Sequence, residues 1–285
     1  MNKFKRLASV LLCMIMVIGC FAGCSSSEKE TDEITDETML IAYTEECKPF
    51  IYTDENGKLT GFDVEVFDAI FDDIKNDYKN YKFVQVDADY KVGEDTAFTD
   101  DEGNEFVAYV MAGGVMKDTG TFNEDFTFTD NIIDNRIVTV TAKDSKIKDY
   151  NGLEKQAVGV VTEQAMAALD ENTTIKNNCK SVKEYSDIKA ALADLDAGKI
   201  TAVVTDEFTF CPLDSKDNYT VLPGELDTIS YVYSLKKYDW YVESINDAIY
   251  ELQSPEYNDA DEFTPIVEKY FGYDASNFDY VPSQD

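Results

Sequence analysis

The chain has 285 residues, of which 57 are acidic and 25 basic, so its formal net charge is −32. A negative field of this strength disfavours nucleic acids and anionic lipid surfaces, and we expect neither as a binding partner. With 44% hydrophobic and 13% aromatic residues the chain is too apolar for a disordered acidic tail, and its length suits one large domain or two compact ones.

The N-terminus has the pattern of a secretory signal. Lys3, Lys5 and Arg6 precede an uncharged, apolar run over residues 7–23. This run is short for a membrane-spanning helix, and a positive segment followed by such a run is typical of a signal peptide. Removing residues 1–23 would take away basic residues and no acidic one, which makes the rest of the chain more acidic still.

The end of this run resembles a bacterial lipobox. Ala22 and Gly23 stand before Cys24, and in a lipobox the chain is cleaved before the cysteine and its thiol is acylated. Cys20 follows Gly19 and is a competing lipid site. We prefer Cys24 because three serines follow it as a polar tether. A stop-transfer helix and an ordinary secreted protein are the alternatives. Residues 24–38 are polar and charged and predict a disordered tether.

Short strands and one amphipathic helix are predicted for the first half of the domain. The helix covers residues 61–74, because Val64, Phe67 and Ile70 recur at helical spacing. The acidic stretch 87–105 predicts a loop. The short apolar runs that predict strands are 39–43, 81–86, 106–111 and 137–141.

The second half predicts a parallel βαβ unit. Apolar runs at 157–161 and 200–204 are strands, and a helix begins at 164–169 between them. A second helix, capped by Ser186 and stopped by Gly198, precedes the second strand. Strand, helix and strand in this order form a parallel βαβ unit. Two further helices over 242–252 and 263–271 close the chain.

Histidine is absent, which removes Ser-His-Asp and Cys-His catalysis and His-ligated metal sites. Beyond the N-terminal segment the cysteines are Cys47, Cys179 and Cys211. Three is an odd number and none has metal-ligand spacing, so we expect no fully paired disulfide framework and no metal site. No catalytic residue and no cofactor is predicted, and we expect that the protein is not an enzyme.

Three groups of segments together resemble the extracellular solute-binding proteins of family 3, which deliver amino acids to ABC importers. The opening motif of that family is similar to residues 48–52 and 56–64. Its middle motifs are similar to 128–130, 143–153 and 158–160. The last group comprises 188–206 and 268–272. In order, these segments span roughly residues 39–272.

The resemblance implies an α/β, two-lobed periplasmic-binding-protein type II fold with two hinge-crossing strands. Lobe one would comprise residues 39–136 plus 232–285, and lobe two residues 137–231. Parallel sheets bind ligands at the carboxyl ends of their strands, so two facing lobes would place two such edges across an interlobe cleft.

The resemblance also implies candidate ligand-binding residues. In the family an aromatic ring often stacks on the ligand three positions before the Phe of the opening motif, and that position is Cys47, before Phe50. The family's carboxylate-clamping Arg matches Thr121 or Phe122. Only Lys117 nearby could supply a charge. Losing a bidentate guanidinium would weaken binding of ordinary α-amino acids by on the order of 2–5 kcal/mol.

Lobe two would contribute the other candidates. The family's Gly-Thr pair after the strand 157–161 is replaced by Glu163 and Gln164. Asp206, which follows the next strand, matches the acidic residue that holds the ligand ammonium in the family. Gly114, after the predicted strand 106–111 of lobe one, completes the set.

We therefore predict a lipid-anchored, extracytoplasmic substrate-binding lipoprotein. It would be a monomer that captures a small polar solute, an amino acid or a related compound, for an ABC permease complex. One alternative is a binding fold used for sensing or surface interaction without transport. The other is a dehydratase-like enzyme of the same fold, which would need a general acid and an anion-holding Arg that the sequence does not show.

Replacing Cys24 by Ser should abolish lipidation, because the hydroxyl is not a substrate for the acyl transfer that the lipobox directs. Mass spectrometry of the mature wild-type N-terminus checks this: we expect an acylated Cys24 as the first residue. A mature chain that begins elsewhere, for instance at Cys20, contradicts the assignment.

Overall fold

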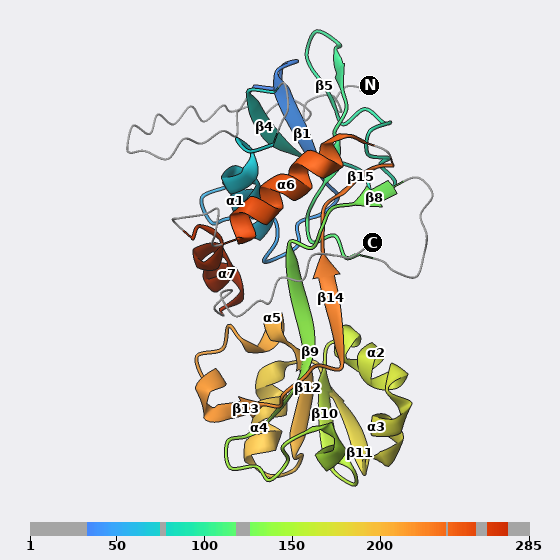
Figure 1. Ribbon diagram of the computed structural model, residues 1–285, viewed down its shortest axis with the longest axis vertical. Coiled ribbons are helices and arrows are strands. Elements are labelled where there is room, and N and C mark those ends of the chain that lie inside the picture. Colours follow the sequence, from blue (N-terminus) through green and yellow to red (C-terminus); the bar gives the residue numbers. More distant parts are fainter. Residues whose placement is uncertain (1–32, 75–77, 118–125, 238, 255–260, 273–285) are drawn as a thin grey trace, which may run out of the picture.

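The computed structural model shows two lobes joined by a pair of strands (Figure 1). The residues that it describes are 33–74, 78–117, 126–237, 239–254 and 261–272. The predicted signal peptide, Cys24 and the Thr121/Phe122 positions lie outside these ranges. No helix within the described residues is both long and apolar enough to cross a bilayer.

Lobe one is built on a five-stranded sheet of order β4-β1-β7-β15-β8. Its interior strand β1 is buried at all six positions, as a continuous apolar run predicts. The strands are β1 (Thr38–Tyr43), β4 (Asn80–Gln85), β7 (Val110–Met111), β8 (Phe126–Phe128) and β15 (Ser234–Lys236), and the helices are α1 (Phe62–Ile70), α6 (Tyr241–Gln253) and α7 (Phe263–Phe271). Two small hairpins pair β2 (Tyr52–Thr53) with β3 (Leu59–Thr60) and β5 (Phe98–Thr99) with β6 (Glu105–Phe106).

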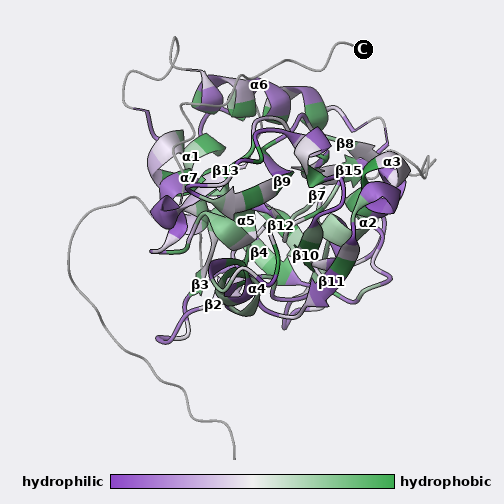
Figure 2. Ribbon diagram, turned by 90° about the horizontal axis from the view of Figure 1, so that it is seen from below, coloured by the Kyte–Doolittle hydropathy of each residue, from purple (hydrophilic) through white to green (hydrophobic). Residues whose placement is uncertain are grey.

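Lobe two has a second sheet of order β11-β10-β12-β9-β13, with β14 also paired to β9. Figure 2 shows its central strands β10 and β12 in green, at the hydrophobic end of the scale. The strands are β9 (Ile133–Ala142), β10 (Ala157–Val161), β11 (Ser181–Tyr185), β12 (Ala202–Asp206), β13 (Tyr219–Val221) and β14 (Asp227–Tyr231). The helices are α2 (Glu163–Glu171), α3 (Thr173–Asn178), α4 (Ile188–Asp196) and α5 (Glu207–Phe210), with short 3-10 turns at Tyr150–Leu153 and Lys216–Asn218.

An antiparallel ribbon connects the two lobes. β9 pairs with β14 from Ile133 to Ile137, and the pairing continues into lobe one through the hydrogen bond from the Ile132 N–H to the Tyr231 carbonyl, 2.8 Å. Beyond the ribbon β8 pairs with β15. The predicted lobe boundaries, 136/137 and 231/232, both fall on residues of this ribbon.

The strands and helices differ from the prediction in a few places. β1 begins at Thr38, which we had assigned to the tether, because the Thr38 hydroxyl accepts the Thr35 N–H and closes a turn. The predicted strand 106–111 is paired only at its two ends, in β6 and β7. Helix α4 is capped by Asp187 rather than Ser186, since the Asp187 carboxylate accepts the Lys189 N–H.

Lobe one also touches lobe two away from the ribbon. The end of α7 lies against the turn that follows α5, and Figure 1 shows these two helices on the same side of the molecule. A Cβ added to Gly272 would stand 2.9 Å from the Cys211 carbonyl oxygen and 2.9 Å from Pro212 Cα. The two backbones are therefore in direct contact across the lobes.

The single tryptophan lies outside these contacts. Trp240, just before α6, is 60% exposed. Its ring lies 3.9 Å from that of Tyr241. Tyr241 packs in turn against Tyr78 and Tyr109, so the ring contacts of Trp240 belong to lobe one.

Replacing Gly272 by Ala should destabilise the protein more than replacing Gly198 by Ala. Both glycines follow helices with positive φ, +71° and +68°, and both variants pay about 1 kcal/mol for that conformation. Only Gly272 adds a clash, because a Cβ at Gly198 meets nothing within 4 Å. Thermal unfolding of the two variants measures the difference; equal losses would show that the interlobe backbone contact is not tight.

Candidate functional site

Asp206 lies at the carboxyl end of β12, the edge at which parallel sheets present ligand-binding residues. All five residues of β12 are buried, and Asp206 itself is only 6% exposed. Its side chain caps α5: Oδ1 accepts the Thr209 N–H at 2.9 Å and Oδ2 accepts the Thr209 hydroxyl at 2.9 Å. The chain leaves the strand and enters the helix at this residue, where aspartate is favoured as a cap.

Asn135 of the hinge strand β9 also bonds Asp206. Its Nδ2 donates to Asp206 Oδ1 at 3.2 Å, and its Oδ1 accepts the Phe208 N–H at 3.2 Å. A donor partner and an acceptor partner fix the orientation of the amide. Tyr231 of β14 also contacts Asn135 through its hydroxyl, and burial raises the pKa of Tyr231 to about 12.

The Asp206 carboxylate has no cationic partner among the described residues. The nearby guanidinium of Arg136 is engaged by Glu207, with Nε to Oε2 at 2.8 Å and Nη2 to Oε1 at 2.6 Å. The Glu207 side chain is 9% exposed and that of Arg136 is 52% exposed, so the bidentate pair is desolvated mainly on its carboxylate side. Within the same ranges no three acidic or cysteine side chains are arranged to hold a metal ion.

A group of aromatic rings lies where the lobes meet. The rings of Phe50 and Tyr231 are 4.4 Å apart, and that of Phe208 stacks on Tyr231 at 5.6 Å. Phe50 is 3% exposed, so its contacts here are packing contacts. Its predicted contact with a ligand stays a prediction.

Cys47 lies beside this ring group. Its backbone pairs with Ile51, and burial, together with the charges of Asp63 and Glu45, raises the pKa of its thiol. The thiol is therefore protonated near neutral pH and a poor nucleophile. Cys47, Cys179 and Cys211 are all free cysteines.

The buried carboxylate of Asp63 fixes the glycine turn that contains Gly114. Asp63 Oδ2 accepts the N–H groups of Gly113 at 2.7 Å and Gly114 at 3.0 Å. Gly114 has a φ of +76°, and a Cβ there would stand 2.8 Å from Cδ2 of Phe50. The turn therefore requires glycine, both for its conformation and for its contact with Phe50.

The remaining predicted residues lie further out. Lys117 joins the hinge through its backbone, since its N–H donates to the Ser230 carbonyl at 2.8 Å. Glu163 and Gln164 are exposed in the first turn of α2, at the same edge of the sheet as Asp206 because β10 and β12 are parallel neighbours. Thr162 caps this helix at a φ of +80°, a strained conformation for a threonine.

Sequence reasoning missed Asn135, Glu207, Phe208 and Tyr231. Cys47, Phe50 and Asp206 were predicted, and the structure brings all three to the surroundings of Tyr231. The available signal was weak: a polar pair, Asn135 and Arg136, stands directly before an apolar strand.

The comparisons with known proteins agree with this architecture. No family model matches the chain. It is 27% identical over 208 residues to the probable amino-acid-binding protein YxeM of Bacillus subtilis, covering 72% of this chain and 71% of that protein. It is 23% identical to the L-cystine-binding protein TcyJ of Escherichia coli over 96% of this chain and 99% of that protein.

Solved structures show the same fold. A polar amino acid ABC uptake transporter substrate-binding protein from Streptococcus thermophilus matches with a TM-score of 0.64 and 22% identity, covering 84% of this chain and 88% of that one. The L-cystine solute receptor of Neisseria gonorrhoeae, in its unliganded open conformation, matches with a TM-score of 0.64 and 19% identity, over 85% and 95% of the two chains.

The protein has the type II periplasmic-binding-protein fold. Its resemblance to the family 3 solute-binding proteins, noted from sequence motifs, is confirmed by relatives named as amino-acid-binding proteins. These relatives are binding proteins rather than enzymes.

Replacing Asp63 by Asn should flatten the pH dependence of stability. Burial raises the pKa of Asp63 to about 6 from an ordinary 3.8. The stability that this group contributes is therefore complete below pH 4 and is lost as the pH rises through 6, by up to about 3 kcal/mol. Asn cannot ionise, and its amide oxygen can still accept both glycine N–H groups.

Melting temperatures of the wild type and the variant between pH 4 and 7.5 check this. We expect the melting temperature of the wild type to fall relative to that of the variant as the pH rises. Asp100→Asn is the control. Hydrogen bonds from Asn104 lower the Asp100 pKa from its ordinary 3.8, so its contribution is lost only below the measured pH range, and the Asp100→Asn curve should run parallel to that of the wild type. Parallel curves for wild type and Asp63→Asn would contradict the assignment.

Proposed function

We propose that this protein is the substrate-binding lipoprotein of an ABC importer and that it binds a small solute carrying an ammonium group, an amino acid or a related amine, between its lobes. The observation that carries the proposal is Asp206. It is a buried carboxylate at the binding edge of the lobe-two sheet, hydrogen-bonded but joined to no cation of the described residues. The names of the relatives support the same class of solute.

A buried carboxylate without a counter-ion is costly, and a cationic ligand would offset that cost. Asp206 accepts three hydrogen bonds, all from neutral donors. An ionised carboxylate has about four acceptor positions, so one remains for an incoming N–H. A charge-assisted hydrogen bond there would be worth roughly 1.5–3 kcal/mol.

The other half of an amino-acid site has less support. Arg136 is the one Arg beyond the signal segment, and Glu207 already occupies its guanidinium. An α-carboxylate would have to compete with Glu207 for the same fork. We therefore propose that the ammonium group, more than the carboxylate, determines which solutes bind.

Lipid anchoring at Cys24, an extracytoplasmic location and an ABC permease partner complete the proposal. The signal-like N-terminus and the lipobox resemblance support the first two. The substrate-binding proteins that share the fold support the third.

Asp206→Asn should weaken ligand binding without harming the empty protein. The Asn oxygen can accept from Thr209 N–H and Asn135, and its NH₂ can donate to the Thr209 hydroxyl, so the cap survives while the charge is lost. Calorimetry should use matched pairs with and without the carboxylate: L-lysine and cadaverine, L-histidine and histamine, L-cystine and cystamine. We expect at least one amine to bind, and the variant to bind it about 10- to 100-fold more weakly.

Asp187→Asn is the matched control, because Asp187 also caps a lobe-two helix but lies away from the junction. The empty Asp206→Asn protein should melt at the wild-type temperature or slightly higher. Normal binding combined with a melting temperature several degrees lower would show that Asp206 is only a helix cap.

A further inference from the structure

We propose that Phe208 is a positioning residue that couples the angle between the lobes to the place of Asp206. The inference concerns the site of the proposed function, but the contacts that carry it exist without any ligand. They all involve α5, the four-residue helix that Asp206 caps.

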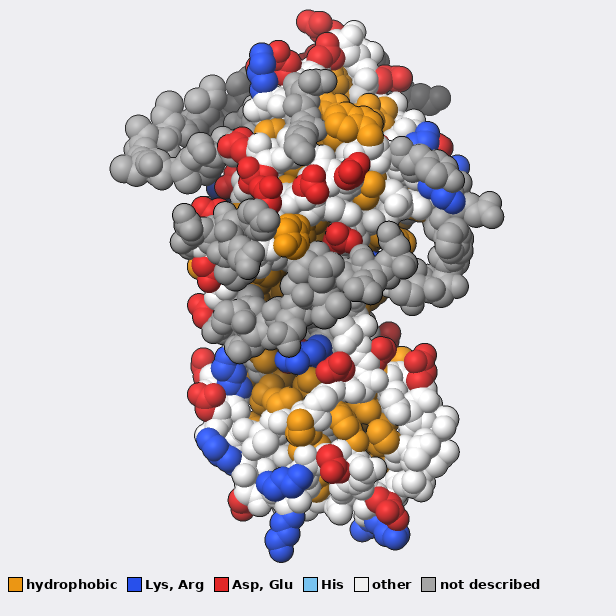
Figure 3. Space-filling view, in the orientation of Figure 1, with side chains coloured by type: hydrophobic (Ala, Val, Ile, Leu, Met, Phe, Trp, Pro, Cys, Tyr) orange, Lys and Arg blue, Asp and Glu red, His pale blue; other side chains and the backbone are white. Residues whose placement is uncertain are grey.

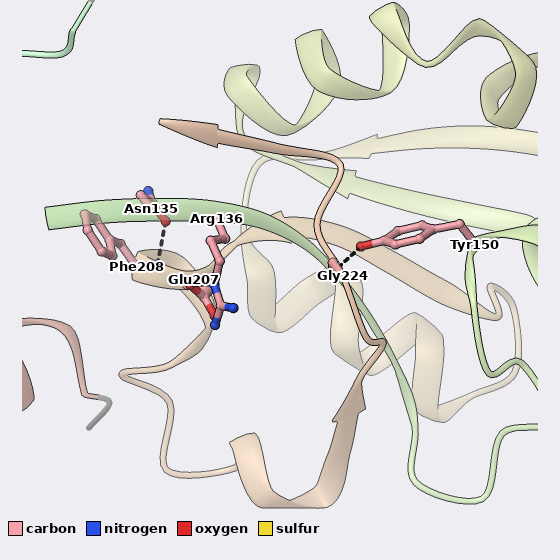
Figure 4. Close-up of polar contacts among 6 residues, drawn as sticks. All are labelled: Asn135, Arg136, Tyr150, Glu207, Phe208 and Gly224. Atoms are coloured by element: carbon pink, nitrogen blue, oxygen red, sulfur yellow. Dashed lines mark hydrogen bonds and ion pairs between the residues drawn. The ribbon is translucent and has the colours of Figure 1, made fainter. Parts of the chain in front are cut away.

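The start of α5 is tied to the hinge strand at three consecutive residues. Asn135 bonds the Asp206 carboxylate and the Phe208 N–H, and Arg136 bonds the Glu207 carboxylate. Neighbouring side chains of a strand point to opposite faces, so the contacts of Asn135 and Arg136 with α5 come from opposite faces of β9. Figure 4 shows the Asn135 and Arg136 side chains leaving the strand in different directions to reach it.

The ring of Phe208 leaves lobe two and packs on lobe one. It stacks on Phe271 with a centroid distance of 3.9 Å and an interplanar angle of 28°, and it lies 6.1 Å from Phe50. Phe271 and Phe50 are buried in the lobe-one core, so they are fixed reference points. Stacked pairs of this kind contribute beyond the apolar area that they bury.

The turn after α5 contacts the end of α7, the lobe-one helix that contains Phe271. Lys216 Nζ donates to the Gly272 carbonyl, and the Gly272 backbone touches that of Cys211 and Pro212. Lobe one therefore contacts the α5 region both through the ring of Phe208 and through the turn that follows the helix.

These contacts restrict how the lobes can rotate. Closure in two-lobed proteins is a rotation about a few hinge residues. Here a rotation about the β9–β14 ribbon must either slide Phe208 across Phe271 or carry α5 along with lobe one. Phe208 is two residues from Asp206, and its N–H shares Asn135 with the Asp206 carboxylate, so moving α5 also moves the cap. Packed contacts of this kind switch between discrete arrangements rather than deform gradually.

The test uses the purified Cys24→Ser protein without ligand, as Phe208→Ala, Phe208→Tyr and Phe98→Ala variants. Phe98 is the matched control, because its ring packs on Phe106 in a hairpin of lobe one. For Phe208→Ala we expect a larger radius of gyration by small-angle X-ray scattering. We also expect at least tenfold faster amide exchange at residues 208 and 209, whose N–H groups are bonded to Asn135 and Asp206.

Phe208→Tyr keeps the ring and should restore both values, and Phe98→Ala should change neither. If Phe208→Ala fails to fold, Lys216→Ala, which removes only the bond to Gly272, should shift both readouts in the same direction by a smaller amount. Wider lobes with unchanged exchange at 208 and 209 would reject the coupling, as would unchanged values of both. Neither measurement requires a ligand. If no amine binds, the proposed function fails, but the coupling through Phe208 can still be confirmed or rejected.

Discussion

The structure depends on one antiparallel pairing, that of β9 with β14. These strands are the continuous hydrogen-bonded connection between two sheets that are otherwise separate, and each sheet has a core of its own. β9 has ten residues. Its first half pairs with β14 in the ribbon, and its second half pairs with β12 inside lobe two. Asn135 and Arg136 occupy the transition, which is why one short stretch of chain orients both Asp206 and Glu207.

The described residues include three buried carboxylates, which the protein accommodates by different means. Glu207 pairs with the guanidinium of Arg136. Asp63 accepts two glycine N–H groups in a wholly buried place, and desolvation outweighs those bonds. Asp206 lies at the end of a strand and accepts bonds from a helix start and a hinge amide. Figure 3 shows acidic side chains crowded over lobe one, whereas acidic and basic side chains are mixed over the visible face of lobe two.

Local patterns predicted the parts of the fold that local physics decides. Strand β10 has the predicted bounds, because five consecutive apolar or small residues in the middle of a sheet leave little choice. The first half of β9 was missed because Asp134, Asn135 and Arg136 interrupt the apolar pattern, although Asn135 is buried in the structure. β11 was missed because it is an edge strand with mostly exposed residues.

The candidate site also combines features that local sequence predicts with features that depend on distant segments. The place of Asp206 at the end of a strand could be predicted because it follows an apolar run, whereas its binding of a ligand stays a prediction. The partners of Asp206 and Glu207 could not be predicted, because Asn135 and Arg136 are 71 residues away in sequence. The stack of Phe208 on Phe271 depends on the docking of two lobes, which no periodicity in either segment records.

The exposure of Trp240 has a spectroscopic consequence. Indole emission depends on the polarity around the ring, and this ring is in water with its contacts confined to lobe one. The red-edge intensity of this protein will therefore report on the solvent rather than on the lobe junction. Tyr231 lies inside the junction. In a variant without Trp240, which would otherwise accept energy from excited tyrosines, tyrosine emission is the optical signal that closure of the lobes would change.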